Sequence, residues 1–455
     1  MAPEKRPGRD PERDRLSRRL TRFAQVGAGL SGAAASMGVN ALVAGPDAQV
    51  RNARVAREAL GRLKGPLMKV AQIMATIPDL LPPEFAAEFA KLQAHAPAMG
   101  PAFVRRRMAA ELGPEWRERF AEFDLGPAHA ASLGQVHRAR DLKGAALAVK
   151  LQYPDMQSAV ESDLTQLRAL LGMGRGLLTG IDAREAVEEI AARLREELDY
   201  GREARAMALF GAFFEGRDDI VAPRPRPDLS TGRLISMDWL DGEGLLALKA
   251  ADQASRDRAA RLLFEAWWSP LTHLGVIHGD PHLGNYSFAA GASRIHMLDF
   301  GCVRIFPPAF VGGVVRLFHA ISAGDREAEA EAYRAWGFTA LTKDLVEVLG
   351  LWARFIYGPL LDDRVRTVAD GVAPGEYGRR EAFAVKQALE TKGPVTIPRE
   401  FVFMDRAAIG LGAAFLHLGA RHNWRALFEA SLDGFAEESL AARQAEALAA
   451  VGLQG

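Results

Sequence analysis

The spacing of apolar positions changes along the chain, and each spacing predicts a different secondary structure. Between about residues 47 and 112 apolar residues recur every three or four positions, which predicts amphipathic helices. The first of these helices carries an apolar stripe made of Leu63, Leu67, Val70, Met74 and Ile77. Prolines shortly after the stripe end this helix, and a second helix is expected at about 85–92.

From about residue 120 the apolar runs become short, which is typical of β-strands. Residues 132–139 and 146–152 flank the turn-forming segment Asp141-Leu-Lys-Gly144 and predict a β-hairpin. A long helix should follow, because Val187, Ile190, Leu194 and Leu198 share one helical face.

The remaining pattern is mostly helical, with two more strands. Residues 233–240 predict a strand that ends in an Asp241-Gly242 turn, and residues 294–298 predict another. The fourteen uncharged residues between Arg406 and Arg421 are too few to span a bilayer and are expected to form a buried helix. A small β-rich part followed by a large helical part indicates an α+β protein.

Composition limits the classes of function. The 455 residues allow two or three domains, and 57 basic residues balance 57 acidic ones, so bulk charge predicts no nucleic-acid partner. The lone cysteine, Cys302, excludes an internal disulfide, and we expect it to pack in the core. These features fit a cytoplasmic protein.

The N-terminal segment, residues 1–46, is basic at first and then uncharged from Phe23 to Pro46. Its uncharged part is rich in glycine and alanine, which favours a flexible or membrane-surface helix over a membrane span. Gly27-Ala-Gly29-Leu-Ser-Gly32 has the spacing of a dinucleotide fingerprint, but no strand precedes it. We therefore expect a membrane contact here, at the inner-membrane surface.

Residue types that carry phosphoryl chemistry occur together in His278-Gly-Asp280-Pro-His-Leu-Gly-Asn285. Phosphoryl transfer needs a carboxylate to orient or deprotonate the acceptor, and oxygen ligands for the metal on the phosphates. We predict Asp280 as the catalytic carboxylate. Asn285 and Asp299, the latter in Asp299-Phe-Gly after a predicted strand, are the predicted magnesium ligands. Asp and Asn are also common turn residues, but the joint spacing favours a kinase-like site.

Lys150, in Leu147-Ala-Val-Lys150, has the position of a phosphate-pairing lysine on a strand. A solvated strand end is the alternative. No Gly-x-Gly-x-x-Gly precedes it; the upstream loop is His129-Ala-Ala-Ser132. Because a Cβ keeps the backbone away from a phosphate, this loop should hold nucleotide differently from a protein kinase.

The segment Ala130-Ala-Ser-Leu-Gly-Gln-Val-His137, followed by Ala148-Val-Lys-Leu-Gln-Tyr-Pro154, resembles the UbiB/AarF family of atypical kinases over about residues 50–440. Lys69-Val-Ala-Gln72 is similar to the family's Lys-x-Gly-Gln signature, and Glu197-Leu-Asp199 to its Glu-x-Asp element. Met237-Asp-Trp-Leu-Asp-Gly242 is similar to the hinge.

The resemblance implies a set of roles. Glu203 would pair with Lys150 as part of the catalytic set, and the helix bearing Lys69 and Gln72 would lie over the cleft and block peptides. The implied nucleotide-binding residues are Ala130, Ala131, Ser132, Lys150, Met237, Lys69, Gln72, Glu197 and Asp199. The implied cofactors are ATP, or ADP, and Mg²⁺.

Two residues depart from the family pattern. Ala71 replaces the signature glycine, which a helix tolerates, and His129 stands where an alanine is usual. No Ala-Pro-Glu follows the Asp-Phe-Gly, so protein substrates are not expected.

Together these observations predict a protein-kinase-like bilobal fold with an N-terminal helical extension. The expected segments are 1–46, 47–112 (extension), 113–240 (β-rich N-lobe) and 241–455 (helical C-lobe). The expected function is an atypical kinase or ATPase that supports ubiquinone or related isoprenoid-lipid metabolism, with nucleotide, a membrane surface and quinone-biosynthesis lipids or proteins as partners. The alternatives are a small-molecule kinase of the aminoglycoside/choline class and a nucleotide-switched membrane scaffold or chaperone without turnover.

Overall fold

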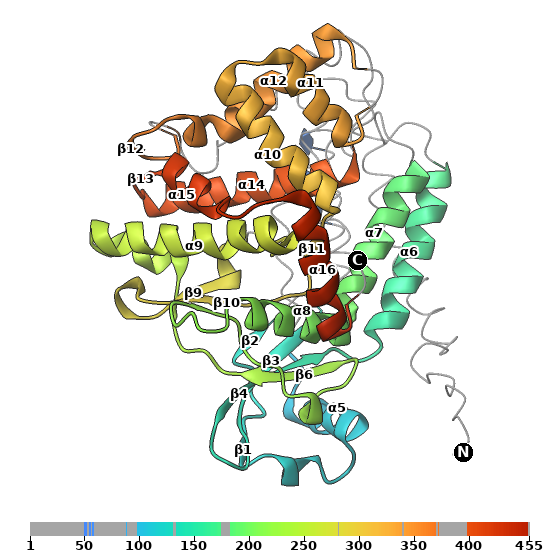
Figure 1. Ribbon diagram of the computed structural model, residues 1–455. Helices are drawn as coiled ribbons and strands as arrows, with labels where there is room; N and C mark the ends of the chain where they lie inside the picture. Colours follow the sequence, from blue (N-terminus) through green and yellow to red (C-terminus); the bar gives the residue numbers. More distant parts are fainter. Residues whose placement is uncertain are drawn as a thin grey trace, which may run out of the picture. The chain divides into compact units, whose positions relative to one another are not determined.

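The computed structural model describes two compact units of the chain (Figure 1). The described residues are 50–51, 54–55, 57–58, 88, 98–130, 133–173, 183–280, 282–338, 341–369, 372 and 398–453. Those up to Gly201, together with 225–239, form unit 1, and 202–224 with 240 onward form unit 2. The helices predicted around Leu67 and at 85–92 lie outside the described residues, apart from Glu88, and the four-segment division stays a prediction.

Unit 1 is built on a five-stranded sheet with the order β1-β3-β4-β6 and with β2 also paired to β3. The strands are β1 Glu122–Phe123, β2 His129–Ala130, β3 Gly134–Arg140, β4 Ala146–Gln152 and β6 Leu234–Asp238. All pairings are antiparallel. The predicted hairpin is confirmed: the Asp141 carboxylate accepts hydrogen bonds from the backbone N–H groups of Lys143 and Ala145, at 2.9 and 2.8 Å, and closes the β3–β4 turn.

Helices cover this sheet. They are α5 Pro101–Leu112, α6 Met156–Met173, α7 Ala183–Leu198 and the start of α8 Tyr200–Phe213, with 3₁₀ turns at Trp116–Arg119 and Pro227–Leu229. The predicted helical face is confirmed in α7, where Ile190, Leu194 and Leu198 are buried. Helix α6, which packs against α7, was not predicted. Val149 and Leu151 of β4 lie in the core.

Unit 2 is mainly helical, as predicted. Its helices are the rest of α8, α9 Gln253–Leu274, α10 Pro308–Ala323, α11 Arg326–Ala335, α12 Lys343–Tyr357, α14 Arg399–Leu418, α15 Trp424–Ser431 and α16 Glu437–Val451, with 3₁₀ turns at Leu245–Ala250, Leu283–Asn285, Ala290–Ala292 and Gly358–Leu361. Helices α14, α15 and α16 pack against α9 (Figure 1), whose Trp267 is buried.

The C-terminal end of α9 is closed by α16. Gly275 ends α9 in the left-handed conformation, at φ +63°. The Gln444 side chain of α16 donates to the carbonyl oxygens of Leu274 and Phe306, at 2.8 and 2.9 Å. A Cβ at position 275 would overlap the Gln444 amide, so a residue without a side chain is needed there.

Short strands complete unit 2. One sheet has the order β5-β10-β9-β7, and β8 pairs with β11 and β12 with β13. Their bounds are β5 Ile220–Val221, β7 Glu243–Gly244, β8 Val276–Ile277, β9 Tyr286–Phe288, β10 Ile295–Met297, β11 Arg304–Ile305, β12 Val365–Arg366 and β13 His422–Asn423. Strand β10 confirms the strand predicted at 294–298. The predicted Asp241-Gly242 turn is wrong, because the chain runs on into β7 and Gly242 lies against β9, where a Cβ would be 2.9 Å from Ser287 Oγ.

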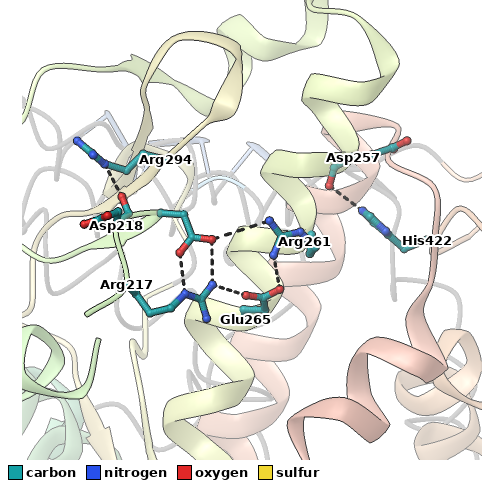
Figure 2. A network of polar contacts seen from close by, with 8 residues as sticks. Arg217, Asp218, Asp257, Arg261, Glu265, Arg294 and His422 are labelled. Carbon is teal, nitrogen blue, oxygen red and sulfur yellow. Dashed lines mark hydrogen bonds and ion pairs between the residues drawn. The ribbon is translucent and has the colours of Figure 1, made fainter. Parts of the chain in front are cut away.

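A charged network fastens the segment between α8 and β5 to α9 (Figure 2). The Arg217 guanidinium donates to both Asp219 oxygens, at 2.7 and 3.0 Å, and to Glu265 at 2.6 Å. Arg261 donates to Glu265 from one helical turn away, at 2.6 Å. The hydrogen bond from Arg217 lowers the pKa of Asp219. Because β5 pairs with β10, this network also holds the strand that leads to Asp299.

Two further expectations concern residues of unit 2. The uncharged stretch falls in α14, where Leu411, Ala414 and Leu418 are buried, as predicted. Among the described helices none is long and apolar enough to cross a membrane. The expectation of a core cysteine was wrong: Cys302 is half-buried, between the buried Gly301 and Val303.

Candidate functional site

His278 joins the loop that carries Asp280 to the Asp-Phe-Gly segment. It follows β8 directly, and its side chain is buried. Nε2 donates to the Leu298 carbonyl oxygen at 2.9 Å, and Nδ1 lies 3.5 Å from the Tyr286 hydroxyl oxygen. Burial raises the pKa of Tyr286, which keeps that hydroxyl a donor. The imidazole also packs edge-on against Phe300, with ring centroids 5.3 Å apart.

Asp280 and Asn285 are bonded to each other. The Asn285 amide nitrogen donates to Asp280 Oδ2 at 2.9 Å and to the Asp280 carbonyl oxygen at 3.2 Å. Asp280 Oδ1 accepts from the backbone N–H of His282 at 3.2 Å. Both side chains are partly exposed. Because the nitrogen of the amide is turned to Asp280, its oxygen is turned away and is available to a cation.

The register of the β9–β10 hairpin places Asn285 opposite Leu298, the residue before Asp299. Tyr286 is opposite Met297, and the pairing continues one step with a 2.8 Å hydrogen bond from the Leu298 N–H to the Asn285 carbonyl. Asn285 therefore precedes β9, and Asp299 follows β10, at the same end of the hairpin. The antiparallel arrangement explains how residues separated in sequence come to one edge.

Asp299 has an unusual backbone conformation. Its φ is +55°, in the left-handed region that costs energy for residues other than glycine. The next residue, Phe300, is fully buried and packs against Phe210 and His278. Asp299 itself is exposed, and its Oδ1 accepts from the Gly301 N–H at 3.2 Å. The buried phenylalanine thus anchors a segment that presents a carboxylate to solvent.

The donor set fits a magnesium–nucleotide complex. Two carboxylates and an amide oxygen are the hard ligands that Mg²⁺ prefers. Within the described part of the chain no three His, Cys, Asp or Glu side chains are grouped so as to hold a metal ion by themselves. Phosphate oxygens and water would have to complete the coordination around Asn285 and Asp299, as in sites where the metal arrives with its nucleotide.

In unit 1, Lys150 is a buried residue of the central strand β4. It lies opposite Val136 of β3 and Ile235 of β6, and only 9% of it is exposed. Its Nζ is 5.1 Å from the centroid of the Tyr200 ring, a cation–π contact. This burial excludes the alternative that Lys150 is a solvated strand end. Tyr200 had not been predicted as a site residue.

The alanine-rich loop is described only at its ends. Ala130 is exposed on β2, whereas Ala131 and Ser132 lie outside the described residues. At the other end, Gly134 lies so close to β4 that a Cβ would be 2.5 Å from the Leu151 carbonyl oxygen and 2.9 Å from the Tyr200 hydroxyl. A side chain at 134 would therefore displace the ring that contacts Lys150.

Gln135 and His137, in the motif that carries the family resemblance, are buried structural residues. Gln135 Oε1 accepts from the Met99 N–H at 2.6 Å, and its Nε2 donates to His137 Nε2 at 2.8 Å. His137 Nδ1 donates to the Asp124 carbonyl at 2.9 Å. Burial lowers the pKa of His137, in keeping with a neutral ring. Gln135, His137 and Ala139 are every second residue of β3 and are all buried. This period of two was the sequence signal that their side chains face inward.

A comparison with protein-family profiles identifies the family of this chain. The profile of the ABC1 atypical kinase-like domain matches residues 91–333. The chain belongs to this family. The matched range contains every predicted site residue except Lys69 and Gln72, and it confirms the resemblance to UbiB/AarF atypical kinases and the kinase-like fold.

Relatives in this family are similar but longer. The mitochondrial atypical kinase COQ8 of Saccharomyces cerevisiae is 26% identical over 321 residues, 69% of this chain and 64% of that protein. COQ8B of Danio rerio is 29% identical over 290 residues, 63% of this chain and 46% of the relative. The chloroplastic ACTIVITY OF BC1 COMPLEX KINASE 8 of Arabidopsis thaliana is 29% identical, over 64% of this chain and 39% of the relative. The alignments thus span about half the length of these relatives.

A solved structure supports the same fold. Rv3197 of Mycobacterium tuberculosis, determined in complex with erythromycin, has a TM-score of 0.58 and 26% identity, and the match covers 81% of this chain and 93% of Rv3197.

In this ABC1 atypical kinase-like domain, Asn285 is bonded to Asp280 within unit 2, and Asp299 follows the residue that pairs with Asn285. Lys150 and Met237 lie on neighbouring strands of unit 1. Of the other predicted residues, Glu203 is 1% exposed in the first turn of α8, Glu197 is half-buried at the end of α7, and Asp199 is exposed between these helices. Lys69 and Gln72 lie outside the described residues. The pairing of Lys150 with Glu203 stays a prediction.

Proposed function

We propose that this protein is an ATP-dependent, magnesium-requiring atypical kinase or ATPase. The observation that carries the proposal is the arrangement in unit 2, where Asn285 is bonded to Asp280 and faces Leu298, the residue before Asp299, at the end of the β9–β10 hairpin. A carboxylate beside a pair of oxygen ligands is what phosphoryl transfer requires. Family membership favours this function over the aminoglycoside/choline class of kinase.

Each residue has a proposed task. Asp280 orients the acceptor hydroxyl or water and takes its proton at the carboxylate. Asn285 and Asp299 provide oxygen atoms to the metal, which when bound would neutralise charge on the phosphates. Lys150 contacts the phosphates, and the Tyr200 ring limits the directions in which its ammonium group can point. Because Lys150 is largely removed from water, its charge acts in a medium of lower effective dielectric than at the surface.

The resemblance and the relatives support a proposal for the substrate class. We propose that the reaction supports ubiquinone or related isoprenoid-lipid metabolism at a membrane surface, with ATP or ADP as nucleotide. Protein acceptors are not expected. The acceptor is found by comparing nucleotide turnover alone, with liposomes, and with phenols that resemble quinone precursors; turnover that rises only with the phenol would indicate transfer to a hydroxyl rather than to water.

Asp299→Asn tests the metal assignment. Asparagine tolerates the left-handed conformation and keeps an oxygen for the Gly301 N–H, so the fold should be retained. Loss of the charge should lower magnesium-dependent turnover by about 100-fold or more, a loss of roughly 2.7 kcal/mol in transition-state stabilisation. Asp433→Asn, at an exposed turn residue, is the matched control. Wild-type nucleotide affinity of Asp299→Asn at saturating magnesium would refute the assignment.

A further inference from the structure

Arg202, in the first turn of α8, contacts the backbone at the end of the Asp-Phe-Gly segment and just beyond it. Its guanidinium donates to the carbonyl oxygens of Gly301, at 3.3 Å, and Val303, at 2.9 Å. Hydrogen bonds from a charged donor are stronger than those between neutral groups, and the planar fork fixes the spacing of the two acceptors. One side chain thus holds both ends of the three-residue segment 301–303.

The middle residue of that segment faces the loop that carries Asp280. A Cβ on Gly279 would overlap the Cys302 carbonyl oxygen and would lie 2.9 Å from Arg304 Cγ. The two backbones therefore meet at close range, which only glycine at position 279 allows. The carbonyl groups of 301 and 303 contact α8, and the carbonyl group of 302 contacts the Asp280 loop.

Gly301 connects Arg202 to the carboxylate of Asp299. Its carbonyl oxygen accepts from Arg202, and its N–H donates to Asp299 Oδ1. A left-handed residue such as Asp299 persists only where its surroundings fix the backbone on both sides. The buried Phe300 ring and the Arg202 bond to Gly301 provide that constraint after Asp299.

We propose that Arg202 is a positioning residue that holds Asp299 and Asp280 in register with each other through residues 301–303. It acts through its bonds to the Gly301 and Val303 carbonyl oxygens. The inference rests on the proposed function for the roles of the two carboxylates, but the linkage itself is a property of the protein without ligand. It assigns to the first turn of α8 a task that is separate from the predicted pairing of Glu203.

Hydrogen exchange of the ligand-free protein tests the linkage directly. Arg202→Gln, which loses the charge and the fork, should speed amide exchange about tenfold in peptides covering both 297–306 and 276–288. Arg202→Lys keeps the charge but not the fork, and should fall between wild type and Arg202→Gln. Arg205→Gln, an exposed position on the same helix, is the control and should change neither peptide. Unchanged exchange in 276–288 would overturn the proposal, because Arg202 would then not reach the Asp280 loop.

A magnesium titration of nucleotide binding gives the second readout. Arg202→Gln should raise the magnesium concentration for half-saturation about tenfold, as is usual when a group behind a metal ligand is lost, and should leave magnesium-free nucleotide affinity within about twofold. Wild-type magnesium dependence in this variant would overturn the proposal. If the wild-type protein itself binds no nucleotide with magnesium, the proposed function fails, and the exchange experiment alone decides the linkage.

Discussion

Replacing His278 by phenylalanine separates hydrogen bonding from packing at the centre of the site. Phenylalanine keeps the ring against Phe300 but removes the Nε2 donor, which leaves the Leu298 carbonyl without its 2.9 Å bond. An unsatisfied buried acceptor costs about 1–3 kcal/mol. For a domain of this size each kcal/mol lowers the melting temperature by about 2–4 °C, so His278→Phe should melt about 2–12 °C below wild type.

The matched variant is His278→Gln, whose amide nitrogen can donate to the same carbonyl group. Thermal unfolding followed by circular dichroism should rank the proteins wild type, then Gln, then Phe. Turnover should follow the same order, since a displacement of about 1 Å at the reacting groups can cost about 100-fold in rate. A melting temperature of His278→Phe equal to that of wild type would refute the reasoning. A melting temperature of His278→Gln below that of His278→Phe would also refute it, because ring packing would then contribute more than the hydrogen bond.

Two other predictions concern unit 1. Tyr200→Leu should weaken nucleotide binding about two- to fivefold in a titration, because a cation–π contact contributes about 0.5–1 kcal/mol, whereas Tyr200→Phe should bind as wild type does; equal binding by Leu and Phe would contradict the role of the ring. Burial lowers the pKa of His137 from its ordinary 6.5, so below about pH 6.5 the unfolded chain binds more protons than the folded one. The free energy of unfolding therefore decreases as the pH is lowered. Lowering the pH from 7 to 5 should therefore reduce the melting temperature of wild type more than that of His137→Asn. Equal reductions would show that His137 does not cause the pH dependence.

The sequence was informative where local pattern or fixed spacing determines the structure. The β3–β4 hairpin follows from two apolar runs around Asp141, and the carboxylates of unit 2 follow from the spacing of Asp280, Asn285 and Asp299. The family profile confirms the family and the kinase-like fold, and the roles of these residues stay a prediction. Periodicity fails for β5, β7, β8 and β11, because strands of two residues are too short to show alternation.

Contacts between distant segments were not predictable. Gln135 meets Met99 from 36 residues away, and Arg202 meets Gly301 from 99 residues away, so no local pattern encodes either pair. The turn predicted at Asp241-Gly242 was wrong because of a contact between distant segments as well. Glycine after aspartate is a strong turn signal, but here Gly242 serves the close approach to Ser287 on another strand.

The hydrogen bond from Gln444 to the C-terminal end of α9 joins segments that the ribosome synthesises at different times. Strand β8 and the His278-Gly-Asp280 loop begin directly after Gly275, whose neighbour Leu274 is bonded to Gln444 across 170 residues. At about 5–20 residues per second, a ribosome needs roughly ten to thirty seconds to synthesise that interval. A nascent chain therefore contains Asp280 well before it contains α16, and the end of α9 next to the Asp280 loop gains its bond to Gln444 only after α16 has been translated.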